Sequence, residues 1–213
     1  FTPDVYTRLI ERTNENLWPL HLLVLAAGVG TLLLFYFGRP RVASLALALI
    51  WIWVGFAYLI RGYAELTPVG LWFGWGFCLQ GMLVLGLGVA GCFQSPARQA
   101  GKLSWWTGLF MVDYGLFIHP VLTWILAGTW TRAEVFGIHP DPTAMAILGI
   151  LLMIAKGWSF CLLAAIPILW CITSGLTLIG LESALAWSLF AAAVLALFAM
   201  VLRCASGWTR AAD

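Results

Sequence analysis

The sequence predicts an all-α protein: a polytopic transmembrane helical bundle of seven spans, with the N-terminus outside, the C-terminus cytoplasmic and an N-terminal interfacial amphipathic helix. Three observations lead to this prediction. Of the 213 residues, 62% are hydrophobic and 9% are charged, whereas soluble domains are about half apolar and a quarter charged. The apolar runs approach the roughly 20 residues that a helix needs to cross a bilayer, and they do not alternate as strands would. Many of the 13 Trp lie near the ends of these runs, as in an interfacial aromatic belt.

The first element, residues 1–16, has the pattern of a helix that lies on the outer membrane surface. Thr2 before Pro3 and Asp4 is a favourable helix start. At helical spacing the apolar and charged residues separate onto two faces: Val5, Tyr6, Leu9, Ile10 and Thr13 on one, Arg8, Glu11, Arg12 and Glu15 on the other. We expect this helix to anchor the first span, with a partner-docking surface as the alternative. The polar start predicts no signal peptide.

A single transmembrane domain, 17–213, is expected next, because no connection is long enough to hold a soluble domain. Its spans are predicted at about 17–37, 42–60, 69–93, 103–128, 142–155, 157–179 and 183–203. The glycines that line the third span, among them Gly70, Gly74, Gly81, Gly86, Gly88 and Gly91, predict that it is the most buried helix, since small residues let helices approach closely. The fifth segment is short. Its 13 residues from Thr143 to Ala155 give about 20 Å of helix, so a re-entrant segment and six spans are the alternative.

The charged residues decide between seven and six spans. With seven, one side carries four Arg and seven acids, and the other carries one acid, Asp213, and seven basic residues: Arg39, Arg41, Arg98, Lys102, Lys156, Arg203 and Arg210. With six, this difference disappears. Lys and Arg favour the cytoplasmic side, so seven spans with a cytoplasmic C-terminus are predicted. The fifth span is then lengthened from 135–142 or lies in a locally thinned bilayer.

Three stretches resemble successive blocks of a known family: "PDVYTRLIERTNENLWP", "AYLIRGYAELTPVGLWFGWGFCLQG" and "FGIHPDPTAMAILGILL". The most specific is the FG-x-x-P-x-P-T block at 136–143. The chain resembles a bacterial family of small multi-span inner-membrane proteins catalogued only as a domain of unknown function. The resemblance implies this architecture and a bacterial inner (plasma) membrane location, and it implies no chemistry.

Two polar residues are predicted inside the membrane. Asp113 lies about ten residues into the fourth span, near mid-bilayer, and an ionisable group there is a functional candidate. Gln80 lies at similar depth in the third span. The pair predicts either a proton or cation pathway or a structural hydrogen bond between helices.

The outer-face ligand candidates are His21, His119, His139 and Asp141. Together with Glu134 and Glu65 they contain the imidazole and carboxylate groups that bind divalent ions, and His21 with His119 is the alternative pair of axial haem ligands. No two histidines have helical ligand spacing, so we predict no metal and no cofactor. In "HPDPT", Asp141 is instead expected to be the N-cap of a helix with Pro142 as its first residue.

Three function classes follow. The first, which we favour, is a non-enzymatic accessory or assembly subunit that packs with other membrane subunits or with copies of itself. The second is a small permease for an ion or solute that uses Asp113 and Gln80. The third is a haem- or pigment-binding membrane protein that uses His21 and His119. No nucleophile–base set, phosphate loop or nucleotide motif is present, so neither an enzyme nor a nucleic-acid partner is expected. A retinal protein is excluded because the last span contains no Lys for a Schiff base.

Overall fold

The computed structural model describes the backbone of residues 1–93, 103–155 and 157–209, and the side chains of these ranges up to residue 202. Every named element is helical. The α-helices are α1 (Pro3–Leu17), α2 (Leu20–Tyr36), α3 (Pro40–Trp53), α4 (Val69–Val89), α5 (Leu103–Asp113), α6 (His119–Ala127), α7 (Pro140–Ile154), α8 (Gly157–Gly180) and α9 (Ala186–Thr209). Two π-helical segments, η1 (Val54–Ile60) and η4 (Tyr114–Ile118), continue α3 and α5, and two short 3₁₀ turns are η2 (Tyr63–Glu65) and η5 (Trp130–Arg132).

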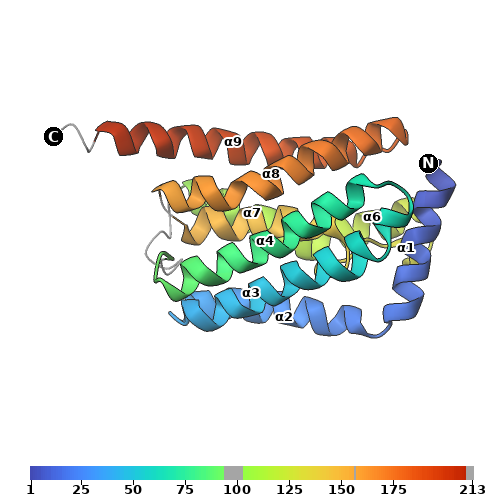
Figure 1. Cartoon of the computed structure of the whole chain (residues 1–213), viewed down its shortest axis with the longest axis horizontal. Coiled ribbons are helices and arrows are strands. Elements are labelled where there is room, and N and C mark those ends of the chain that lie inside the picture. Colours follow the sequence, from blue (N-terminus) through green and yellow to red (C-terminus); the bar gives the residue numbers. More distant parts are fainter. Residues whose placement is uncertain (94–102, 156, 210–213) are drawn as a thin grey trace.

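The long helices lie side by side along the long axis of the molecule, and α1 crosses one end of this bundle (Figure 1). The axis of α1 is bent by 87° from that of α2. α1 buries Ile10 and Asn14, and the Asn14 amide donates to the carbonyls of Thr131 and Ala133, at 2.8 Å each. An ion pair between Arg132 and Glu11 adds a second link. α1 is therefore held against the 129–135 segment as a cap on the bundle.

Four helical stretches are long and apolar enough to cross a membrane. They are Pro40–Glu65, Val69–Val89, Leu103–Ala127 and Gly157–Gly180, and the bent pair of α1 and α2 is a fifth if it counts as one span. The remaining apolar helices, Pro140–Ile154 and the searched part of α9, Ala186–Leu202, are shorter. All seven predicted apolar segments are thus helical, and their length and composition alone identify four or five of them as candidate spans.

The most buried of the described helices is α7, and the expectation that it would be the third span was wrong. All 15 residues of α7 are buried, whereas α4 exposes Trp72, Trp75 and Met82. The four glycines at 70, 74, 81 and 88 do bring α4 against the α3–η2 segment. However, α7 has neighbours on every side, and a helix that is apolar all round can be buried all round. The short segment is the centre of the bundle.

Glycines bring α5 and α7 into backbone contact. A Cβ on Gly149 would lie 2.8 Å from the backbone nitrogen of Val112, and closer still to the carbonyl oxygen of Gly108. A Cβ on Gly115 would meet the carbonyl oxygen of Pro142 at 2.5 Å. Side chains longer than hydrogen have no room at these crossings, so α5 and η4 run directly against the central helix.

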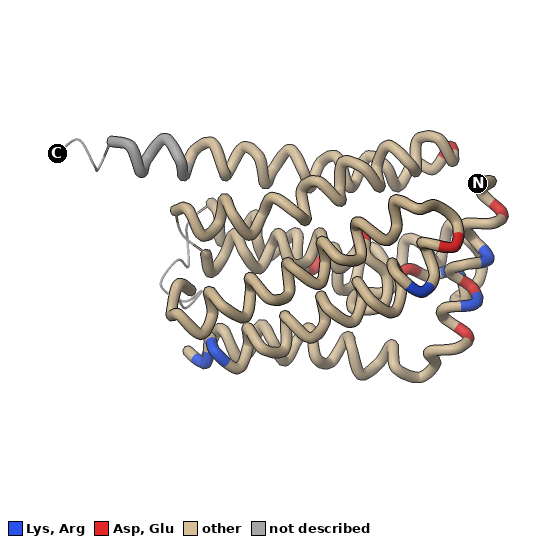
Figure 2. Tube along the Cα trace, viewed as in Figure 1, with Lys and Arg blue, Asp and Glu red and all other residues tan. Residues whose placement is uncertain are grey.

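Charged residues separate between the two ends of the bundle. Figure 2 shows that acidic residues gather, together with several arginines, at the end capped by α1, while the charged residues that are coloured at the opposite end are basic. Arg39 and Arg41, at the start of α3, belong to that second end. The remaining predicted cytoplasmic charges lie outside the described side chains: Arg98, Lys102, Lys156, Arg203, Arg210 and Asp213.

Candidate functional site

Polar side chains from distant parts of the chain meet inside the bundle at the end capped by α1. We call them the buried polar cluster: Tyr6, Tyr58, His119, Thr123, Glu134, His139, Asp141, Trp170 and Ser174. Ionisable groups taken out of water in an otherwise apolar protein are costly unless paired, so such a cluster is a functional candidate.

Glu134 is the centre of the cluster and is 4% exposed. One carboxylate oxygen lies 3.2 Å from Nε2 of His119, and the other accepts a long hydrogen bond, 3.4 Å, from the Tyr6 hydroxyl. The backbone N–H of Glu134 donates to the Thr123 hydroxyl at 3.0 Å, which fixes the residue against α6. Burial acts to raise the pKa of Glu134, but the hydrogen bond and charge of His119 outweigh it and hold the pKa below its ordinary value. Glu134 is therefore a carboxylate at neutral pH.

His139 precedes α7 and is buried as a neutral ring. Its Nδ1 accepts a hydrogen bond from the backbone N–H of Val135 at 3.0 Å, and its ring stacks edge-on against Tyr58, with centroids 5.1 Å apart. Burial lowers the pKa of His139 to about 4, because the imidazolium would lose its hydration. His139 thus contributes no positive charge to the cluster at neutral pH.

Asp141 does not cap α7, which corrects the sequence-based prediction. The helix begins at Pro140, with His139 as its N-cap residue. The Asp141 carboxylate instead accepts hydrogen bonds from two α8 side chains, the indole N–H of Trp170 at 2.7 Å and the Ser174 hydroxyl at 2.7 Å. Thr143 organises the turn: its hydroxyl accepts from the N–H of Gly137 at 2.8 Å and donates to the His139 carbonyl at 2.6 Å. The stretch is a helix start, as predicted, but Asp141 joins two helices.

The predicted pairing of Asp113 with Gln80 was also wrong. Gln80 is buried, and its amide donates to the carbonyl of Leu163 on α8 at 2.6 Å. Asp113 is exposed on the outside of the bundle and has no interaction with the described residues. The two residues therefore form no shared polar site, and a permease pathway built on both lacks its geometry.

The outer-face histidines do not converge as one ligand set. Nε2 of His21 lies 2.8 Å from the Asn14 side-chain oxygen, whereas His119 contacts Glu134 and Glu65 is exposed. Within the part of the chain that the structure describes, no group of three or more His, Cys, Asp or Glu residues could hold a metal ion. His21 and His119 each have a separate protein partner, so the haem arrangement has no support from their contacts.

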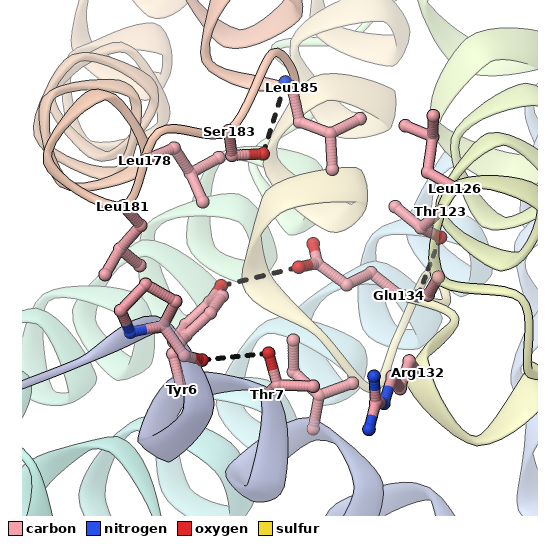
Figure 3. Close-up of a pocket in the computed structure, with 13 residues that line it drawn as sticks. Tyr6, Thr7, Thr123, Leu126, Arg132, Glu134, Leu178, Leu181, Ser183 and Leu185 are labelled. Carbon is pink, nitrogen blue, oxygen red and sulfur yellow. Dashed lines mark hydrogen bonds between the residues drawn. The ribbon is translucent and has the colours of Figure 1, made fainter.

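A pocket of about 260 Å³ leads from the surface beside α1 to Glu134 (Figure 3). In this view the Glu134 carboxylate lies centrally among the lining residues and faces the Tyr6 hydroxyl. α1 forms one wall of the pocket, the end of α6 a second, and the end of α8 with the α8–α9 turn a third. The apolar lining of the pocket includes Leu126, Leu178, Leu181 and Leu185. The pocket therefore joins a buried anion to the surface.

Sequence reasoning missed Glu134 as the centre of this arrangement, and it missed Tyr6, Tyr58 and Trp170 altogether. Glu134 was considered only as one of several outer acids. One signal in the sequence could have identified Glu134: it lies within the largely apolar loop "AEVFGIH". A loop exposed to water does not need apolar residues, so these residues indicate that the loop and its acid are buried.

The described chain is helical, with four or five stretches long and apolar enough to span a membrane and a polar cluster enclosed at one end. The chain belongs to the family of unknown function DUF6064, whose model matches residues 4–207. No curated protein and no solved structure was found to match the chain.

Proposed function

We propose that the chain is a seven-span protein of the bacterial inner membrane, with the end capped by α1 outside. Seven helical segments of the described chain support this number of spans: α2, α3 with η1, α4, α5 with η4 and α6, α7, α8 and α9. Although α7 is short, it is buried among the other helices and has no surface facing lipid that must match the thickness of the bilayer. The separation of charges supports the orientation, since Lys and Arg favour the cytoplasmic side.

Reporter fusions test this orientation. A reporter that is active only in the periplasm is expected to be silent when fused after Lys156 or Arg203 and active after Glu182. Activity after Lys156, or silence after Glu182, contradicts the seven-span orientation.

We further propose that the protein is a non-enzymatic accessory or assembly subunit, and that Asp113 marks the surface that packs against its partner. Asp113 is the last of the 11 residues of α5, about 15 Å along the helix from Leu103. It lies on an exposed face with Trp106, Phe110 and Phe117, at the helical spacing of one stripe. A carboxylate without a partner among the described residues, set among aromatic side chains at this depth, is the observation that carries the proposal.

An apolar groove runs beside this stripe. Phe110 and Tyr114 form one wall, Met145 of α7 the floor, and small residues of α9 the other wall, enclosing about 230 Å³. Small residues on α9, Ser188, Ala191 and Ala192, leave room for a neighbouring helix. The groove gives a partner helix a place to pack within reach of the Asp113 stripe.

Charge complementarity defines the partner as a membrane helix of another protein that carries Lys or Arg at mid-depth. A carboxylate facing lipid costs roughly 3 kcal/mol near the bilayer centre, and a cation on the partner offsets this cost. A second copy of this chain cannot supply that cation, because its 11 Lys and Arg all lie at the ends of the apolar segments or between them.

Substitutions at Asp113 are expected to act oppositely on the complex and on the isolated chain. A photo-crosslinking residue at Phe110 should capture a membrane helix with a mid-depth Lys or Arg. Asp113→Leu should abolish the crosslink but stabilise the purified chain by about 3 kcal/mol, since it removes a lipid-facing charge. Asp113→Glu should retain the crosslink, and Asp113→Lys should recover it when the partner's basic residue is changed to Asp.

The matched control places the crosslinker at Leu23, on an exposed part of α2, where no such product is expected. Crosslinks only to lipid or to a second copy, or a captured helix without a basic residue, contradict the proposed partner. Destabilisation of the isolated chain by Asp113→Leu contradicts the outward role of the carboxylate.

A further inference from the structure

The pocket under α1 holds a carboxylate with fewer hydrogen bonds than it can accept. A carboxylate has about four acceptor positions, and the side chain of Glu134 receives one contact from His119 and one long contact from Tyr6. The pocket gives a third group access to the same carboxylate. Glu134 is thus a buried anion with acceptor positions free for a ligand.

Among the described residues, acidic side chains outnumber Arg and Lys around Glu134. Nδ1 of His119 is buried with no partner among the described residues. At the pocket rim, Arg132 is paired with Glu11, and the nearby Asp141 adds an acidic group. The site therefore favours a cation.

The donor set selects an organic cation over a metal ion. Among the described residues, His119 and Glu134 form a pair but no group of three or more metal ligands, and a zinc site typically has at least three protein ligands. An ammonium group instead donates hydrogen bonds, and a carboxylate together with the hydroxyls of Tyr6 and Thr123 can accept them. Leucine side chains line the way out, which suits an apolar substituent.

We propose that the pocket beneath α1 binds a small primary ammonium compound with an apolar substituent, whose N–H groups donate to the Glu134 carboxylate. The volume of about 260 Å³ is at the small end of ligand pockets. The same chemistry occurs in a free alkylamine and in the headgroup of an aminophospholipid, and the position of the pocket at the end of the bundle is open to both sources. This site goes beyond the helix packing proposed for Asp113 and is independent of it.

Binding of n-butylammonium to the full chain, purified in detergent and stripped of lipid, tests the proposal. Isothermal titration calorimetry should give saturable binding, and tetramethylammonium, which has no N–H donor, should not compete. Glu134→Gln should weaken binding by about 10- to 100-fold, the usual effect of losing a buried charge-assisted hydrogen bond. Glu15→Gln, which removes an exposed acid of the same helix cap, should leave binding unchanged.

A second variant keeps the test valid if Glu134→Gln fails to fold. Ala127 also lines the pocket, and Ala127→Phe should block n-butylammonium without changing the Glu134 side chain. To separate the two sources, the chain in nanodiscs of phosphatidylethanolamine should bind n-butylammonium more weakly than in nanodiscs of phosphatidylglycerol if the lipid headgroup occupies the pocket, and equally if a free amine does. Absence of saturable binding, or binding unaffected by both variants, overturns the proposal.

Discussion

Gly149→Ala is expected to lower the free energy of unfolding by at least about 3 kcal/mol, the upper part of the range for overpacked cores. Gly149 lies at the centre of α7, where α5 crosses it. The new methyl group would lie 2.8 Å from the backbone nitrogen of Val112 and 2.9 Å from Cβ of Met111, and closer to the Gly108 carbonyl oxygen. Backbone atoms cannot rotate away as a flexible side chain can, so the two helices must separate along their length.

Gly86→Ala on α4 is the matched control. Nothing lies within 4 Å of the position that its Cβ would occupy, and Ala is favoured over Gly in a helix by up to about 1 kcal/mol. This variant should be neutral or slightly stabilising. Unfolding of both variants by denaturant in mixed micelles measures the difference. Equal stability of the two would contradict the close crossing of α5 and α7.

Asp141→Ala is expected to cost about 3 kcal/mol, because it leaves the indole N–H of Trp170 and the hydroxyl of Ser174 without their acceptor inside the protein. Each buried donor left unpaired costs about 1–3 kcal/mol. The expected loss lies below the upper limit for two donors, because the variant no longer buries a carboxylate. Asp141→Asn should cost less, since the amide oxygen can still accept one of these bonds. Asp141→Ser should cost as much as Asp141→Ala, because a hydroxyl is too short to reach α8.

The order of these variants separates two roles of Asp141. A helix cap would be replaced by Ser with little loss and would cost about 1 kcal/mol when changed to Ala. Asp4→Ala in the first turn of α1, an exposed acid, provides the control for a simple effect of charge at a helix start. If Asp141→Ser leaves the free energy of unfolding unchanged, the hydrogen bonds from Asp141 to α8 do not stabilise the protein, and the predicted role of Asp141 is wrong.

Several features of this protein follow from local sequence alone. The apolar runs predict the helices because each run is long enough to satisfy its backbone hydrogen bonds internally in lipid. The alternation of apolar and charged residues in 1–16 predicts α1, and the prolines at 140 and 142 predict a helix start within two residues of where α7 begins. These signals are contained within one or two helical turns, so no tertiary contact is needed to interpret them.

The faces that the helices bury were decided only by the tertiary structure. In a soluble protein, polar residues mark the outer face of a helix, but in a membrane the lipid is as apolar as the core, so an apolar helix does not reveal which side is buried. Asp113 was therefore placed inside and lies outside, and the third span was expected to be the most buried helix, whereas α7 is. The π-helical segments η1 and η4 also rotate the residues that follow them relative to a regular α-helix.

The buried polar cluster depends on the same long-range arrangement. Tyr6 and Glu134 are 128 residues apart, and Asp141 and Ser174 are 33 apart. No spacing rule relates such pairs, because their distance is set by how α1 crosses the bundle end and how α7 packs against α8. The sequence determined that ionisable groups would occur near the ends of the apolar segments. The packing of helices around α7 decided which of these groups meet, because the contacts join residues that are far apart in the chain.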